Sequence, residues 1–145
     1  MKTLLRNVLA VIAGFVLGSI VNMSLVTAGP HVFAPPPGVD MSDMNSLKAA
    51  AHLMQPKHFL FPFLAHALGT LVGALTAHVI AASHRSVFAY IIGGLNLAGG
   101  IAASFMIPAP TWFIALDLLV AYLPMAWLAS KLGRTLRPEH AAVTA

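Results

Sequence analysis

Four long apolar stretches, separated by short polar or proline-containing segments, dominate the pattern along this chain. A helix that crosses a bilayer needs about 20 consecutive apolar residues, because its backbone polar groups must bond within the helix where water is absent. Four segments reach this length, at about 8–28, 59–82, 86–107 and 111–130. The pattern therefore predicts an all-α polytopic membrane helix bundle, with residues 1–145 as a single membrane domain.

Prolines mark the ends of several predicted spans. Pro62 falls in the opening turn of the second span, where a missing N–H costs little. Pro108 and Pro110 bracket a very short turn, which predicts an antiparallel hairpin of the third and fourth spans. Pro124 lies inside the fourth span and predicts a kink there, because it removes one helical hydrogen bond.

The connection between the first two spans, residues 29–58, changes character along its length. Three consecutive prolines at 35–37 favour an extended segment that cannot be helical. A short amphipathic helix is expected next, capped by Asp40 or Ser42 and ended by Pro56. Its apolar side consists of Met44, Leu47, Ala51 and Met54. We expect this helix to lie on the outer membrane surface.

Composition and charge support a membrane protein and suggest its orientation. Apolar residues make up 59% of the chain and charged residues only 8%, so water is an unsuitable solvent. The net charge of +4 comes from scattered basic residues that form no patch, so the lipid bilayer, and no nucleic acid, is the expected partner. Basic residues flank the spans on one side, at Lys2, Arg6, Arg85, Lys131, Arg134 and Arg137. This bias predicts that both termini are cytoplasmic.

The first span has an alternative interpretation. Lys2 and Arg6, followed by an apolar core and the small residues up to Ala28, are also typical of a secretory signal. The apolar run is longer than a usual signal core, and its small residues recur every four positions as in a packing face. Retention gives four spans and cleavage would leave three.

Small residues at four-residue spacing predict close helix packing. Membrane helices associate through such residues because lipid offers no hydrophobic drive to bring helices together. The candidate packing residues are Gly14 and Gly18 in the first span, Gly69 and Gly73 in the second, and Gly93 and Gly100 in the third. We expect a compact bundle.

Polar side chains within the spans are the main functional candidates. Asn22, His66 and Asp117 lie about 10 Å below the outer boundary on three different helices, and Asn96 lies somewhat deeper. We therefore expect an intramembrane polar cluster in which Asp117 pairs with His66. Such a pair could carry a proton or cation, but polar groups also serve as hydrogen-bonding links between helices. Both interpretations stay open.

No cofactor, metal site or enzymatic activity is expected. The outer-side residues His31, Asp40, Asp43, His52 and His58 match no ligand spacing, and the chain has no cysteine. His66 and His78 differ in depth and direction, so they cannot ligate one haem, although two copies could pair their His66 residues. His78 is expected near the cytoplasmic interface. Phosphate-loop, metalloprotease and nucleophile-elbow motifs are absent from the sequence.

Three stretches of the chain resemble a family of small bacterial inner-membrane proteins with no established activity. They are PPGVD at 36–40, PKHF at 56–59 leading to AHALGT at 65–70, and PAP at 108–110 leading to LD at 116–117. The resemblance implies a bacterial source, the inner membrane and four spans, and it brings no substrate or catalytic residue. The chain is unlike the small multidrug-resistance exporters, whose essential carboxylate lies in the first span, whereas Asp117 is in the fourth.

Three functions fit the sequence, and the third of them is a haem or metal carrier that uses His66 or the outer-side histidines. The first is a helix-packing or accessory subunit of a membrane assembly, acting through association with itself or with another membrane protein. The alternative is an oligomeric proton- or cation-coupled transporter of a small solute that uses Asp117 and His66. Transport would require self-association, because the chain is too short for the inverted repeats of transporter folds.

Overall fold

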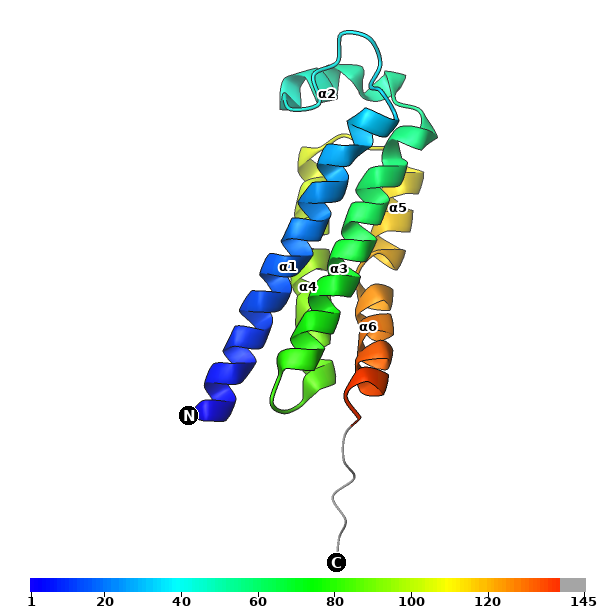
Figure 1. Cartoon of the computed structure of the whole chain (residues 1–145). Coiled ribbons are helices and arrows are strands. Elements are labelled where there is room, and N and C mark those ends of the chain that lie inside the picture. The colour runs from blue at the N-terminus through cyan, green and yellow to red at the C-terminus, as the bar shows by residue number, and fades with distance from the viewer. Residues whose placement is uncertain (139–145) are drawn as a thin grey trace, which may run out of the picture.

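A computed structural model describes residues 1–138 as an arrangement of helices, with no strand in that range (Figure 1). The helices are α1 Lys2–Val32, α2 Met44–Ala50, α3 Leu60–Ile80, α4 Arg85–Met106, α5 Thr111–Val120 and α6 Leu123–Leu136. Short 3-10 turns at Ala51–Leu53 and Pro56–Phe59 link α2 to α3. The all-α prediction is confirmed for these residues. Residues 139–145 of the predicted single domain lie outside the described part.

Within residues 1–138, four helical segments are long and apolar enough to cross a membrane, as predicted. They are Lys2–Val32, Pro56–Ile80, Arg85–Met106 and Thr111–Leu136. The first is longer than the expected 8–28, because the helix already begins at Lys2 and continues through Pro30 to Val32. At about 1.5 Å per residue this 31-residue helix is roughly 46 Å long, so it must tilt in or project from a hydrocarbon layer of about 30 Å.

The distribution of apolar side chains suits lipid rather than water. The buried apolar side chains are mostly alanines, whereas large ones such as Phe15, Ile101 and Leu119 are exposed on the outer surface. In a soluble protein the large apolar residues would fill the core. Here small residues inside let the helix backbones approach, and large ones outside face the lipid chains.

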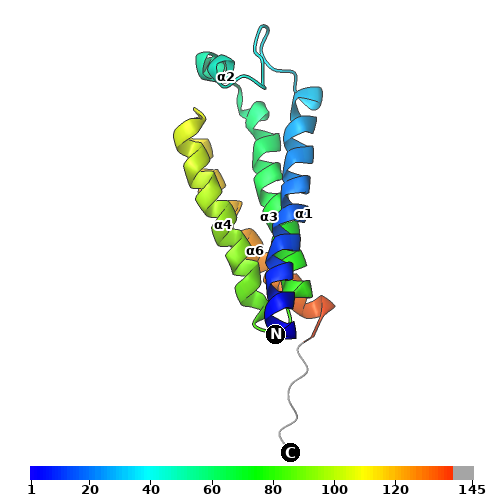
Figure 2. The same ribbon diagram turned by 90° about the vertical axis from the view of Figure 1, so that its left-hand side faces the viewer.

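α3 is the central helix of the bundle, with α1, α4 and α6 packed around it (Figures 1 and 2). α1 begins and α6 ends at the same end of the molecule, here called the terminal end, and α2 covers the opposite, loop end. The core in the terminal half is tight and made of small side chains around one isoleucine. It consists of Ala74, Ala77, Ala89, Ile92, Ala126 and Ala129.

A close helix contact joins the glycines of α1 and α3. A Cβ added to Gly14 would lie 2.5 Å from the Gly73 carbonyl oxygen, and one added to Gly18 would lie 2.7 Å from the Gly69 carbonyl oxygen. Neither position has room for a side chain. α1 is therefore held closely against α3 at these two positions.

The glycines of α4 have three different environments. A Cβ on Gly93 would lie 2.6 Å from the Ala126 Cβ, so this glycine packs α4 against α6. Gly100 packs against a side chain, since an added Cβ would overlap the Tyr122 ring and hydroxyl. Around Gly94 and Gly99 nothing lies within 4 Å of an added Cβ.

The fourth span is broken rather than kinked. α5 ends at Val120, and α6 begins with Pro124 in its first turn. Proline cannot donate an N–H to the Val120 carbonyl, and its ring crowds that carbonyl, so a continuous helix cannot pass. Ala121 and Tyr122 form the break, where Tyr122 has the non-helical angles φ −117° and ψ −81°.

At the loop end, α2 forms close to the predicted position but with a different cap. The Asp43 carboxylate accepts hydrogen bonds from the backbone N–H groups of Asn45 and Ser46, at 3.0 and 3.3 Å. Asp40 instead accepts bonds from the Ser42 amide and hydroxyl in a local turn. The Asp40 or Ser42 cap is therefore wrong, because that turn already uses both side chains.

Candidate functional site

Asp117 of α5 and His66 of α3 meet inside the bundle. The Nδ1 atom of His66 lies 2.9 Å from both carboxylate oxygens of Asp117. The Asp117 side chain is 7% exposed and the His66 side chain 27%. A buried carboxylate is costly unless it is paired and hydrogen-bonded, so this contact stabilises Asp117 at membrane depth. The expected pairing of the two residues is present.

Tyr122 completes the cluster and was not expected from the sequence. Its hydroxyl donates a hydrogen bond of 2.8 Å to Asp117 Oδ2, and its ring stacks against His66 at a centroid distance of 5.8 Å. Only 2% of Tyr122 is exposed. We call His66, Asp117 and Tyr122 the Asp117 cluster. Together they give the carboxylate two donors and hold the imidazole on two sides.

The helix break allows Tyr122 to reach Asp117. On an uninterrupted helix, residues five apart point about 140° away from each other around the axis. Tyr122 leaves the helical path at the break, which brings its hydroxyl back to the Asp117 side. Pro124 therefore shapes the site without touching the carboxylate.

A second polar contact joins α3 to α4. The Asn96 side-chain amide donates a 3.0 Å hydrogen bond to the Thr70 hydroxyl, and Thr70 is 1% exposed. Thr70 follows His66 by one helical turn and therefore lies on the same face of α3. That spacing was a signal in the sequence that could have identified Thr70.

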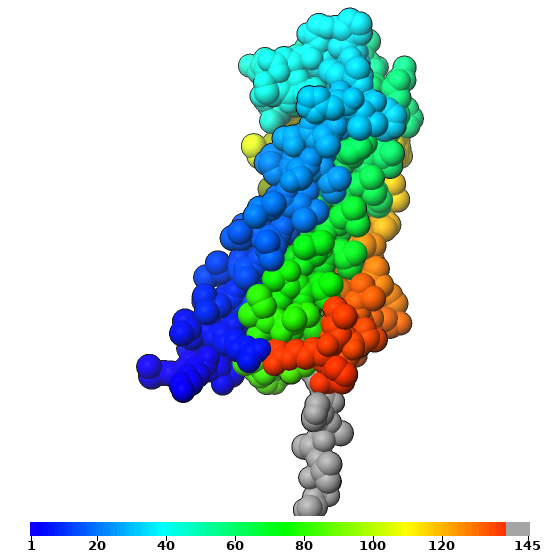
Figure 3. All heavy atoms as spheres, in the orientation of Figure 1, coloured from blue at the N-terminus to red at the C-terminus, as the bar shows by residue number. Residues whose placement is uncertain are grey.

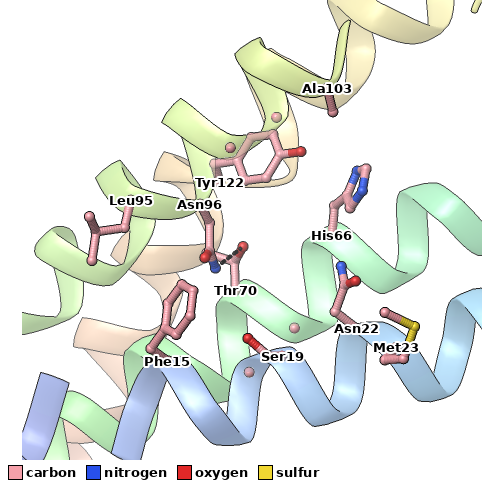
Figure 4. A pocket seen from close by; sticks show the side chains of 14 residues that line it. Phe15, Ser19, Asn22, Met23, His66, Thr70, Leu95, Asn96, Ala103 and Tyr122 are labelled. Carbon is pink, nitrogen blue, oxygen red and sulfur yellow. Dashed lines mark hydrogen bonds between the residues drawn. The ribbon is translucent and has the colours of Figure 1, made fainter. Parts of the chain in front are cut away.

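A cleft of about 360 Å³ opens between α1, α3 and α4 in the half of the bundle near the loop end (Figure 4). The Asn22 and His66 side chains point into it from neighbouring helices, and Tyr122 forms part of its wall. Its lining residues are Phe15, Gly18, Ser19, Asn22, Met23, His66, Gly69, Thr70, Leu95, Asn96, Gly99, Gly100, Ala103 and Tyr122. Its volume is near the lower limit of ligand pockets in proteins.

The floor and the rim of the cleft differ in polarity. Thr70 and Tyr122, on the floor, are buried polar residues, whereas Phe15, Met23 and Leu95, on the rim, are exposed and apolar. α4 leans away from α1 and α3 toward the loop end (Figure 2), and residues of all three helices line the cleft. A bound molecule would therefore meet hydrogen-bonding groups at depth and apolar groups at the entrance.

The predicted polar cluster is thus divided into two layers. Asn22, His66 and Asn96 line the cleft, while Asp117 lies behind His66 and Tyr122 and is not part of the wall. Asn96 bonds to Thr70 rather than to Asp117. A molecule in the cleft could therefore reach the Asp117 carboxylate only indirectly, through the His66 imidazole and the Tyr122 phenol.

His78 differs from its expected position at the interface. It is fully buried, and its ring packs against Gly133 of α6, where an added Cβ would overlap the imidazole. The missing side chain at Gly133 provides the space for the ring. His78 lies three turns along α3 from His66, so the two imidazoles belong to separate parts of the bundle.

The polar residues of the loop end have structural contacts. His58 accepts the Gln55 N–H through Nδ1, and its Nε2 lies 3.2 Å from the Ala34 carbonyl oxygen. Asp40 and Asp43 bond to their own turn and helix. Within residues 1–138, no three His, Cys, Asp or Glu side chains are grouped so that they could hold a metal ion.

Comparison with protein-family models, curated proteins and solved structures found no match to this chain. Its function must therefore be argued from the cleft and the Asp117 cluster.

Proposed function

We propose that this protein binds a small hydrogen-bonding solute in the cleft and moves it across the membrane together with a proton. The observation that carries the proposal is the arrangement of the Asp117 cluster directly behind a polar cleft floor. If Asp117 only linked helices, it would need no opening beside it. A titratable pair that borders a cleft can exchange protons with whatever enters.

His66 is suited to pass a proton between the cleft and Asp117. Its Nδ1 faces the carboxylate, so the rest of the ring, including Nε2, is directed away from Asp117, and the residue lines the cleft. A carboxylate at Nδ1 fixes the tautomer of a neutral imidazole and stabilises the charged imidazolium. Asp117 would therefore hold the charge, and His66 would receive or release the proton on the solute side.

The remaining cleft residues would recognise the solute. Asn22 offers an amide donor and acceptor, and the Asn96 amide is already oriented by Thr70. These neutral groups favour a polar, hydrogen-bonding ligand over a strongly charged one. The terminal half of the bundle is filled by its alanine core, so release on the other side requires rearrangement or a second copy.

Infrared difference spectroscopy of the reconstituted protein tests proton binding directly. Acidification of the outer medium should produce a carboxyl band that is lost in Asp117→Asn and shifted in His66→Gln. Gly99→Ala is the control, because this glycine lines the cleft with open space around it. If no pH-dependent carboxyl band appears, the cluster is a fixed hydrogen-bonded link and the proposal is wrong.

Transport is measured next, in vesicles that contain a pH-sensitive dye. A panel of small amides, alcohols and amines is added outside, and proton entry is followed for wild type and Asp117→Asn. We expect solute-dependent proton entry in wild type and none in the variant. Equal entry in both proteins would show that Asp117 does not couple the movement of the solute to a proton.

A second candidate is the accessory subunit of a membrane assembly, acting through helix association. The observation that favours it is the half of α4 after Gly93, which contains no buried residue within the part of the chain that the structure describes. Gly94 and Gly99 have open space around them, and Phe105 is 87% exposed. A helix from another subunit could pack there.

The native mass of the protein, extracted gently from its own membrane, separates the two candidates. Copurification in a fixed ratio with a larger complex would support the accessory role. A small homo-oligomer alone would support the transporter, and an absorption spectrum of the same sample tests for haem.

We further propose that the membrane is the bacterial inner membrane, on the basis of the resemblance given above. The basic residues at the terminal end support a cytoplasmic position of that end.

A further inference from the structure

Three arginines from distant parts of the chain converge at the terminal end, so the expectation that the basic residues form no patch is wrong there. Arg6 donates from Nε to the Ile80 carbonyl oxygen at 2.7 Å, and Arg137 donates from Nη1 to the Val79 carbonyl oxygen at 2.6 Å. Arg85 donates from Nη1 to the carbonyl oxygen of Arg137 at 2.9 Å. The start of α1, the start of α4 and the end of α6 therefore meet around the last turn of α3.

Figure 3 shows this meeting on the surface, with the dark blue start of α1 against the orange-red end of α6. We call Arg6, Arg85 and Arg137 the arginine cluster. Each guanidinium has five N–H donors, and the bonds above use only Nε of Arg6 and one Nη atom of each of the others. Most N–H donors of the cluster therefore take no part in these bonds.

The cluster has no acidic partner in residues 1–138. Of the described carboxylates, Asp40 and Asp43 lie at the loop end and Asp117 is bound to His66. The pKa of the Arg137 guanidinium is lowered, first by its removal from water and then by the positive charges of Arg85 and Arg6. The three cations are thus close enough to repel one another, and the carbonyl dipoles at the end of α3 only partly offset that repulsion.

The position of the cluster indicates what would neutralise it. It lies at the end of the membrane-crossing helices, where Lys131 also sits over the Trp127 ring at 4.1 Å, as is typical of the interface between lipid and water. Phosphate groups of lipids lie at that level. A guanidinium matches paired phosphate oxygens through two parallel N–H bonds, and three together suit one anionic head group.

We propose that Arg6, Arg85 and Arg137 form a binding site for a phosphate group, supplied by an anionic phospholipid of the leaflet at the terminal end. The site is independent of the transport proposal, because it lies at the opposite end of the bundle from the cleft. Its occupant would hold together α1, α4 and α6, which meet there through side-chain to backbone bonds.

The test uses the full-length protein in nanodiscs of phosphatidylcholine, with or without phosphatidylglycerol. We measure the thermal unfolding midpoint and, by native mass spectrometry, the lipid retained. Phosphatidylglycerol should raise the midpoint of wild type and be retained selectively. Each arginine changed to glutamine should weaken its binding about fivefold, and the triple variant Arg6→Gln, Arg85→Gln, Arg137→Gln should lose the effect.

A matched triple variant removes the same charge from the same end outside the cluster: Lys2→Gln, Lys131→Gln, Arg134→Gln. It should keep the selective retention of phosphatidylglycerol. Equal loss in both triple variants would show a diffuse surface attraction and overturn the site, as would the absence of selectivity in wild type.

Inorganic phosphate tests whether the phosphate comes from solution. Added to phosphatidylcholine nanodiscs, it should not raise the unfolding midpoint. If it does so as strongly as phosphatidylglycerol, the phosphate comes from solution and the lipid assignment is wrong.

A second variant covers the case in which the glutamine protein does not fold. The triple variant Arg6→Lys, Arg85→Lys, Arg137→Lys keeps all three positive charges but loses the planar guanidinium groups, which bind two phosphate oxygens at once. It should retain phosphatidylglycerol more weakly than wild type. If it retains the lipid as well as wild type does, charge alone suffices and the guanidinium site is wrong.

Discussion

The Tyr122 hydroxyl donates to Asp117 Oδ2 at 2.8 Å across a break in the fourth span. The two residues belong to the same membrane crossing, yet an unbroken helix would turn them apart. Pro124 ends that helix and so makes the contact possible. The backbone break, the tyrosine and the buried carboxylate should therefore be energetically coupled.

Tyr122→Phe tests this coupling. It removes one hydrogen bond to a buried carboxylate, so it should lower the free energy of unfolding by about 1–3 kcal/mol. Pro124→Ala allows the helix to continue and should turn the hydroxyl away from Asp117. In a Pro124→Ala background, Tyr122→Phe should then cost almost nothing. Denaturation in detergent measures both steps, and additive losses would contradict the coupling.

Gly100→Ala and Gly99→Ala form a matched pair at the wall of the cleft. A methyl group at Gly100 would overlap the Tyr122 hydroxyl, whereas at Gly99 it meets nothing within 4 Å. Gly100→Ala should therefore disturb the Asp117 cluster and shift the infrared carboxyl band. It should lower the free energy of unfolding by about 1–3 kcal/mol. Gly99→Ala should raise the free energy of unfolding by about 0.5–1 kcal/mol, because alanine has a better helix propensity than glycine. Similar behaviour of the two variants would show that Gly100 is not required to accommodate Tyr122.

The sequence was sufficient for the features that depend on regular helices. Apolar length predicts the four crossings, and counting depth along ideal helices predicts that His66 meets Asp117. Four-residue spacing also identifies Gly14 and Gly18, which pack against Gly73 and Gly69. Each of these predictions needs only the period of the α-helix and the thickness of the hydrocarbon layer of a bilayer.

Features that depend on an interrupted helix, or on the residues of a neighbouring helix, could not be predicted. The place of Tyr122 follows from the backbone angles of a two-residue break, which the presence of Pro124 alone does not specify. The sequence marks Gly100 as a packing residue, but its partner, Tyr122, could not be foreseen for the same reason. His78 is buried because Gly133 on another helix lacks a side chain, and no periodicity within α3 reveals that.

Gly73→Ala and Gly94→Ala compare a packed and an open glycine. A Cβ at Gly73 would lie 2.7 Å from the Gly14 carbonyl oxygen, so α1 and α3 must separate. We expect a loss of about 1–3 kcal/mol in unfolding free energy. Gly94→Ala has open space and should not destabilise the bundle. Thermal unfolding in detergent compares the two, and an unchanged Gly73→Ala protein would contradict the close α1–α3 contact.

Single cysteines test the proposed orientation, because the natural chain has none. Lys48→Cys places a thiol at the loop end, and Arg134→Cys places one at the terminal end. In intact cells a membrane-impermeant maleimide should label Lys48→Cys at once. Arg134→Cys should be labelled only after the membrane is opened. The reverse pattern would place the termini outside.

Asn7 ties the start of α1 to the α3–α4 turn. Its side-chain oxygen accepts the Ala82 N–H at 2.8 Å, and its amide donates to the Ser83 hydroxyl at 3.1 Å. Asn7→Ala removes both bonds and leaves the Ala82 N–H without its acceptor in a part-buried turn. It should therefore lower the free energy of unfolding by about 1–3 kcal/mol. Ser83→Ala removes only the second bond and should cost less.

Ser24→Ala is the control on the same helix, because that hydroxyl bonds only to the Ile20 carbonyl of its own helix. It should leave unfolding almost unchanged. Hydrogen exchange at Ala82 locates the effect, since its amide should exchange faster in Asn7→Ala and keep its protection in the other two variants. If Ala82 exchanges equally in all three variants, Asn7 contributes nothing to the stability of the turn.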